Sequence, residues 1–189
     1  GLLQADHGTV DFMGHKVNRL PMHRRARLGI NRTFQVPKVF RDMTVRENIE
    51  VAARSVRLDP REIDPILEDI GLAGTASRVA GALTVNQQKR LDLGRALATQ
   101  PKLLLLDEPT AGMNPQETAE FTEFVARLRT ERNLTVLLIE HDMRVVMGVS
   151  DRVTVLDYGE KIAEGSPGEI QKNERVIEAY LGTAAVTTP

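Results

Sequence analysis

Two adjacent carboxylates follow an aliphatic run in the middle of the chain. The segment from Lys102 to Pro109 reads Lys-Leu-Leu-Leu-Leu-Asp-Glu-Pro, which places the acids at Asp107 and Glu108. Ligands of open parallel sheets bind beyond the carboxyl ends of the strands, so a buried strand over 103–106 would direct both acids at such a site. Asp107 would offer oxygen ligands to a hard cation such as Mg²⁺, and Glu108 could polarise an attacking water. A strand that stops at a polar turn explains the same residues equally well.

A second aliphatic run favours the site. Like the run over 103–106, Thr135–Ile139 is predicted to be a strand covered on both faces, and it is followed by Glu140, His141 and Asp142. The carboxyl ends of adjacent parallel strands meet at one edge of a sheet, so His141 would join the two acids there. A zinc site is disfavoured, because the other histidines all lie in the N-terminal stretch.

Composition excludes several classes of protein. The 189 residues suit one domain, and 25 basic against 26 acidic residues give a net charge of −1, which argues against a bulk nucleic-acid binder. The chain has no Cys, so disulfide scaffolds, Cys-ligated zinc and thiol nucleophiles are excluded. The run between Lys16 and Arg41 is basic, which alone would suggest a phosphate-binding patch. We interpret it instead as a solvated helix face. The apolar runs are too short to span a membrane, and no targeting segment is visible.

Periodicity and turn signals predict the elements that position these residues. Thr44 and Glu47 form a capping-box pattern, and Gly71 is a stop signal for the helix before it. The strand, helix and strand over 103–139 read as a parallel right-handed crossover. The expected elements are a hairpin over 8–16, strands over 30–34, 103–106, 135–139, 153–156 and 161–163, and helices over 19–28, 45–54, 60–72, 86–100, 115–130 and 143–149, with further helices up to residue 181. The pattern predicts an α/β core interrupted by a mostly helical insert between about Val36 and Pro101.

Five motifs, in this order along the chain, resemble those of the ATP-binding-cassette (ABC) ATPases. They are Arg32-Thr-Phe-Gln35 as the glutamine loop, Leu83-Thr-Val-Asn-Gln87-Gln88-Lys-Arg90 as the signature, Leu103–Pro109 as Walker B, Ala111-Gly-Met-Asn114-Pro115 as the loop after Walker B, and Ile139-Glu140-His141-Asp142 as the switch histidine. The resemblance implies a P-loop-type ABC ATPase core with a mostly parallel sheet and an inserted helical subdomain.

A narrower resemblance is to the ATPase subunits of branched-chain or other hydrophobic amino acid importers. It rests on several further segments: Thr44-Val-Arg-Glu-Asn48, Glu140-His-Asp-Met143, Leu156-Asp-Tyr-Gly159, Ile162-Ala-Glu-Gly165 and the ending Val176–Gly182. Urea importers share much of this pattern, so the transported solute stays open. The resemblance implies a subunit that powers transport by hydrolysing ATP within a dimer.

The resemblance also implies roles for individual residues, with ATP and Mg²⁺ as cofactors. Gln35 and Asp107 would hold Mg²⁺, and Glu108 would be the general base. His141 would contact the γ-phosphate, and Gln35 would also contact the attacking water. The remaining nucleotide contacts are assigned to Thr84, Asn86, Gln87 and Asn114, with Thr84 and Gln87 facing the nucleotide of a second copy.

The same resemblance implies a domain division and partners. Residues 1–35 would be part of the N-terminal ATPase core, 36–101 the helical subdomain with the signature, 102–182 the core with Walker B and the switch histidine, and 183–189 a tail. The partners would be membrane permease subunits and a second ATP-binding subunit, identical or different, and not nucleic acid. The protein would lie in the cytoplasm, peripherally on the inner face of the plasma membrane.

Two features depart from the family pattern. The 189 residues contain no Gly-Lys pair and hence no phosphate loop. In the family that loop precedes a segment like Gly1–Val10, so we expect the chain to start after it, to lack the first strands and to be inactive alone. Val85 and Asn86 replace small residues of the signature, one of them a Gly, which predicts weaker contact with the second copy's nucleotide. A degenerate, non-catalytic cassette that binds a permease or a partner ATPase therefore stays an alternative.

Overall fold

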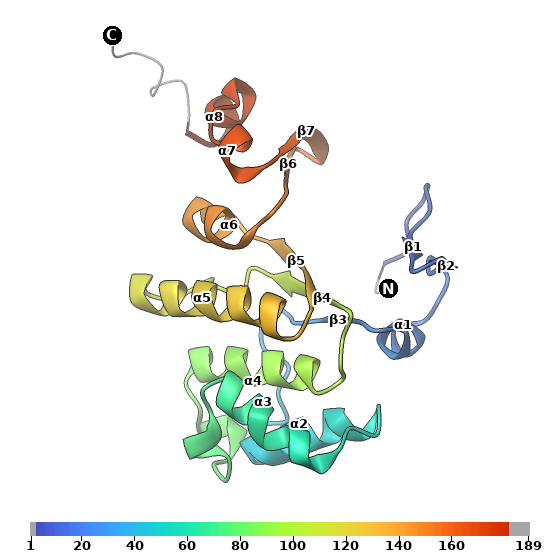
Figure 1. Ribbon diagram of the computed structural model, residues 1–189, viewed down its shortest axis with the longest axis vertical. Coiled ribbons are helices and arrows are strands. Elements are labelled where there is room, and N and C mark those ends of the chain that lie inside the picture. Colours follow the sequence, from blue (N-terminus) through green and yellow to red (C-terminus); the bar gives the residue numbers. More distant parts are fainter. Residues whose placement is uncertain (1–2, 182–189) are drawn as a thin grey trace. The chain divides into compact units, whose positions relative to one another are not determined.

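The computed structural model describes residues 3–181, so the predicted tail over 183–189 lies outside the described residues (Figure 1). The chain forms two compact units. The first holds the chain up to Met113 together with Arg127–Ile139, and the second holds Asn114–Ala126 and the chain from Glu140 onward.

The first unit combines a parallel sheet with a group of helices. Its helices and strands are β1 (Asp11–Phe12), β2 (His15–Lys16), α1 (Met22–Leu28), β3 (Ile30–Arg32), α2 (Val45–Arg54), the 3₁₀ turn η1 (Pro60–Glu62), α3 (Ile63–Asp69), the 3₁₀ turns η2 (Ala73–Thr75) and η3 (Ala80–Ala82), α4 (Val85–Leu97), β4 (Leu103–Asp107) and β5 (Thr135–Ile139). Helix α5 (Pro115–Glu131) contributes residues to both units. The sheet has the order β3-β4-β5, and both pairings are parallel, as predicted for β4 and β5.

Most of the predicted elements are confirmed, and their boundaries differ where local chemistry intervenes. Thr44 and Glu47 form the expected capping box at the start of α2. Gly71, with φ of +68°, follows α3 as expected of a stop signal. Helix α1 begins only at Met22, because Pro21 has an extended backbone and serves as its N-cap.

The prediction that β4 and β5 are covered on both faces is wrong. Leu104 and Leu106 are buried, whereas Leu137 and Ile139 are 52% and 56% exposed. The register pairs Leu105 with Leu137, so alternate residues of the two strands share one face of the sheet. That face is only partly covered over β4, in the middle of the sheet, and is open over β5 at its edge.

The helical insert has a buried apolar core of its own. Helices α2, α3 and α4 lie side by side (Figure 1). Gly94 of α4 leaves room for side chains from the other two segments, because a Cβ atom there would be 2.6 Å from Cδ1 of Ile70 and 3.1 Å from Cδ1 of Ile49. Asn48 is fully buried and bonds the backbone before α2: its Oδ1 accepts from the Phe40 N–H at 2.8 Å, and its Nδ2 donates to the Phe40 carbonyl at 2.9 Å.

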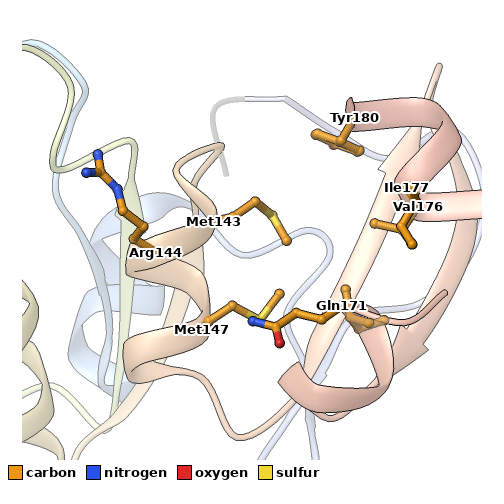
Figure 2. Close-up of a pocket in the computed structure, with 8 residues that line it drawn as sticks. Met143, Arg144, Met147, Gln171, Val176, Ile177 and Tyr180 are labelled. Carbon is orange, nitrogen blue, oxygen red and sulfur yellow. The ribbon is translucent and has the colours of Figure 1, made fainter. Parts of the chain in front are cut away.

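The second unit is a hairpin covered by helices. It contains α6 (Met143–Val149), β6 (Val153–Asp157), β7 (Glu160–Gly165), α7 (Pro167–Ile170) and α8 (Glu174–Leu181). The two strands are antiparallel, and Tyr158 and Gly159 both have positive φ in the tight turn between them. Figure 2 shows Met143 and Met147 of α6 facing Val176 and Tyr180 across an apolar cavity of about 260 Å³.

Candidate functional site

The parallel pairing of β3 and β4 brings the glutamine-loop segment to the acidic end of β4. The register pairs Arg32 with Leu105, and the Thr33 N–H continues the ladder to the Leu105 carbonyl at 3.0 Å. Arg32 Nη2 lies 3.2 Å from Asp107 Oδ2, and the two side chains are 32% and 41% exposed. The guanidinium also lies over the Phe34 ring, 4.5 Å from its centroid. The carboxylate of Asp107 therefore has a cation beside it.

Gln35 and Glu108 meet at the same edge of the sheet. Gln35 Nε2 donates to Glu108 Oε2 at 2.8 Å. The Glu108 N–H donates to the carbonyl of Ile139 at 2.9 Å, so the residue is fixed beside the end of β5. Its φ of +43° is left-handed, a conformation that costs a non-glycine residue free energy and is frequent at functional sites. Of the predicted catalytic residues, the structure brings these two into contact.

The signature-like segment forms the start of α4. Thr84 caps the helix through a reciprocal box, in which Gln87 N donates to Thr84 Oγ1 at 3.3 Å and Thr84 N donates to Gln87 Oε1 at 3.1 Å. Asn86 lies in the first turn of α4, with an ordinary φ rather than a positive one. Its side chain is thus presented from a regular helix. Val85 beside it is 67% exposed.

Lys89, further along α4, holds the turn that follows β4. Lys89 Nζ donates to the carbonyl of Pro109 at 3.0 Å and to that of Ala111 at 2.5 Å. This contact links the signature helix to the backbone directly after Glu108.

A buried charge pair on α4 was missed by the sequence analysis. Arg95 Nη1 lies 3.4 Å from Asp92 Oδ1, and the two side chains are 20% and 8% exposed. Burial raises the pKa of the Asp92 carboxyl, although the hydrogen bond from the Phe34 N–H and the charge of Arg95 oppose this shift. Burial likewise lowers the pKa of the Arg95 guanidinium, and the charge of Asp92 opposes it. An acid between the buried Leu91 and Leu93 was the available sequence signal.

Two predicted site residues belong to the second unit. Asn114 and Glu117 cap the start of α5: the Glu117 N–H donates to Asn114 Oδ1, and the Asn114 N–H donates to Glu117 Oε2, both at 2.9 Å. The His141 side chain is 69% exposed, with Nδ1 at 3.8 Å from Glu140 Oε2. Glu140 Oε2 also accepts from the His141 N–H at 3.1 Å.

Within the described part of the chain, no three His, Cys, Asp or Glu side chains cluster closely enough to hold a metal ion together. The donor set of Asp107 and Gln35 nevertheless suits Mg²⁺, which keeps several waters and takes one or two carboxylates plus substrate phosphates. None of the helices over 3–181 has both the length and the apolar character needed to cross a membrane.

Comparison with known proteins decides the family. A family model described as "ABC transporter" matches residues 1–111. The chain belongs to the ABC transporter ATP-binding family. A second model, described as "Branched-chain amino acid ATP-binding cassette transporter", matches residues 160–186 of the cassette.

Curated relatives and solved structures agree with this assignment. The cassette is 40% identical to the high-affinity branched-chain amino acid transport ATP-binding protein BraF of Pseudomonas aeruginosa and 42% identical to LivG of Escherichia coli, in each case over 97% of this chain and 80% of the relative. The ABC transporter cassette MJ1267 superimposes with a TM-score of 0.82 at 30% identity, covering 95% of this chain and 79% of that one. A structure of the same cassette in its ADP conformation gives a TM-score of 0.81 at 31% identity. The α/β fold of an ABC ATPase is thereby confirmed.

The left-handed backbone of Glu108 predicts a stability difference between two substitutions. Glu108→Gly and Glu108→Ala both lose the contact with Gln35, but only glycine adopts positive φ without a steric cost. We expect the glycine variant to have the higher free energy of unfolding in urea, by about 1 kcal/mol. At the control position Glu120, inside α5, alanine should be the more stable of the same two substitutions. If Glu108→Ala is as stable as Glu108→Gly, the backbone at residue 108 is not strained.

The raised pKa of Asp92 predicts a pH dependence of stability. Just above the ordinary carboxyl pKa of about 4, the folded chain holds a proton at Asp92 that the unfolded chain has lost. The stability contributed by Asp92 is therefore present below that pH and is lost as the pH rises through the folded-state pKa. The difference in free energy of unfolding between the wild type and Asp92→Asn should thus decrease as the pH rises from about 4.

The control for this measurement is Asp142, whose pKa is lowered by the hydrogen bond from the Arg144 side chain. Its contribution is present above the ordinary carboxyl pKa and is lost as the pH falls, so Asp142→Asn should give the opposite slope. Urea unfolding at a series of pH values measures both slopes. A wild-type advantage over Asp92→Asn that grows with pH would mean that pairing with Arg95, rather than burial, dominates at Asp92.

Proposed function

We propose that this cassette is the ATP-binding subunit of an importer for branched-chain or other hydrophobic amino acids and powers transport by hydrolysing ATP. The observation that carries the catalytic part is the hydrogen bond between Gln35 and Glu108 at the end of β4. The names of BraF and LivG support the substrate class, since both are branched-chain amino acid transport proteins. The match of residues 160–186 to a branched-chain amino acid cassette model supports it further.

In this proposal Glu108 is the general base that polarises the attacking water. Its left-handed backbone and its N–H bond to Ile139 fix the carboxylate beyond the strand, and Gln35 orients it. Asp107 and Gln35 would hold Mg²⁺, whose charge offsets that of the transferred phosphoryl group. Arg32 keeps Asp107 compensated by a positive charge.

The remaining assignments concern the nucleotide and the partners. Thr84, Asn86 and Gln87 at the start of α4 would face the nucleotide of a second ATP-binding subunit, because a helix N-terminus favours anions. His141 would contact the γ-phosphate, and Asn114 would line the nucleotide site. The subunit would work on the cytoplasmic face of the plasma membrane, bound to permease subunits. The helical insert over 36–101 would be the domain that receives them.

One observation favours a second candidate, a non-catalytic cassette that serves only as a binding module. The Asn86 side chain is presented from the first turn of α4, where the family signature has glycine. A side chain there restricts how closely a phosphate of the second subunit can approach the backbone. If Asn86→Gly raises ATP turnover severalfold, the side chain limits catalysis but does not abolish it.

A chimera tests the proposed function. This chain replaces the aligned part of Escherichia coli LivG, to which it is 42% identical, and the relative keeps its remaining residues. We expect the purified chimera to hydrolyse ATP, and Glu108→Gln to lower the rate about 100-fold or more, because a general base contributes that much. Glu62→Gln in the 3₁₀ turn η1 is the matched control and should leave the rate unchanged. In cells without LivG, the chimera should restore leucine uptake.

Two results would contradict the proposal. A chimera that binds ATP without turning it over would favour the non-catalytic module. A chimera that hydrolyses ATP equally well with Glu108→Gln would remove Glu108 from the mechanism.

A further inference from the structure

Three charged residues of α4 form a stripe along one side of the helix. Lys89, Asp92 and Arg95 are spaced three residues apart, which places them on successive turns of the same side. We call this set the polar stripe. It runs through the most buried part of the helix, between residues such as Leu91, Leu93 and Leu97.

The C-terminal half of the polar stripe, Asp92 and Arg95, binds the segment that carries Gln35. Asp92 Oδ2 accepts from the Phe34 N–H at 3.3 Å, directly before Gln35 in sequence. Arg95 Nη1 donates to the Lys38 carbonyl, and its guanidinium lies 4.6 Å from the centroid of the Phe40 ring. The backbone is therefore bound to α4 on both sides of Gln35.

The N-terminal half of the polar stripe, Lys89, binds the segment that follows Glu108. Lys89 donates to the carbonyls of Pro109 and Ala111, in the turn that begins directly after Glu108. Both partners of the hydrogen bond between Gln35 and Glu108 thus lie in backbone segments that the polar stripe holds.

Stability alone gives a poor account of the buried pair in this stripe. Removing two charges from water costs free energy that their attraction often fails to recover, so apolar residues in the same place are commonly as stable. The orientation of the pair is specific, however, because Asp92 bonds one side of the glutamine loop and Arg95 the other. A planar guanidinium with a fixed fork of donors is suited to such a role.

From these contacts we infer that Asp92 and Arg95 are positioning residues, which hold Gln35 against Glu108 by fixing the backbone from Phe34 to Lys38. The inference rests on the proposed function for its catalytic meaning, but the contact itself needs neither nucleotide nor permease. The helix that presents Thr84 and Gln87 at its start would thereby also align the general base of its own subunit.

Nuclear magnetic resonance of the ¹⁵N-labelled chain tests the inference through the side-chain amide of Gln35. Its resonance is assigned by its loss in Gln35→Glu, and Glu108→Ala gives the reference position with the acceptor removed. Asp92→Ala should move the Gln35 resonance at least about halfway to that reference, because a charge-assisted hydrogen bond is lost. It should also speed hydrogen exchange at the Phe34 amide about tenfold or more.

The matched control is Asp69→Ala, which breaks a different Asp–Arg pair, between α3 and Arg132 at 2.5 Å. It should leave the Gln35 resonance in place. Arg95→Lys keeps the positive charge but loses the planar guanidinium, so it should move the Gln35 resonance in the same direction as Asp92→Ala does. It replaces Asp92→Ala as the test variant if Asp92→Ala does not fold.

An unmoved Gln35 resonance in folded Asp92→Ala or in Arg95→Lys would overturn the inference. An equal shift in Asp69→Ala would do so as well, since the effect would then be general loosening. If the Gln35 resonance shifts as expected while the LivG chimera shows no turnover, the positioning role stands and the proposed function fails.

Discussion

The parallel pairing of β3 with β4 is the constraint on which the site depends. It brings Arg32 beside Asp107 and Gln35 beside Glu108, although the partners are 75 and 73 residues apart in sequence. The register sets these contacts, because a slip of one residue would turn each side chain to the other face of the sheet. The helical insert lies between the two strands in sequence, so β3 and β4 can pair only if the insert returns the chain to the same edge.

Several features of the site cost folding free energy but fix the positions of its side chains. Glu108 has a left-handed backbone, and Asp92 and Arg95 carry charges into a poorly solvated region. By contrast, the helices that position them follow ordinary rules, with capping boxes at α2 and α4 and a glycine where three helices meet. The strained backbone of Glu108 and the buried Asp92–Arg95 pair thus lie next to the predicted site, as expected where function competes with stability.

Local chemistry made much of the fold predictable from sequence. The capping box at Thr44, the stop at Gly71 and the presence of the aliphatic strands β4 and β5 all follow from neighbouring residues. The open face of β5 could not be predicted, because an aliphatic run does not reveal whether other elements cover the strand. The motif order indicated that Gln35 and Glu108 belong to one site. The pairing of Arg32 with Asp107 and the role of the polar stripe needed the long-range register, which no local pattern contains.

The contact between Gln35 and Glu108 should couple the two residues energetically at the end of β4. A double-mutant cycle with Gln35→Ala, Glu108→Ala and the double variant measures that coupling through the free energy of unfolding in urea. The contact predicts a coupling free energy of about 1 kcal/mol, because the charged acceptor strengthens the hydrogen bond whereas its exposure to solvent weakens it. Changes that add to within about 0.3 kcal/mol would mean that the two residues do not interact and would contradict the account.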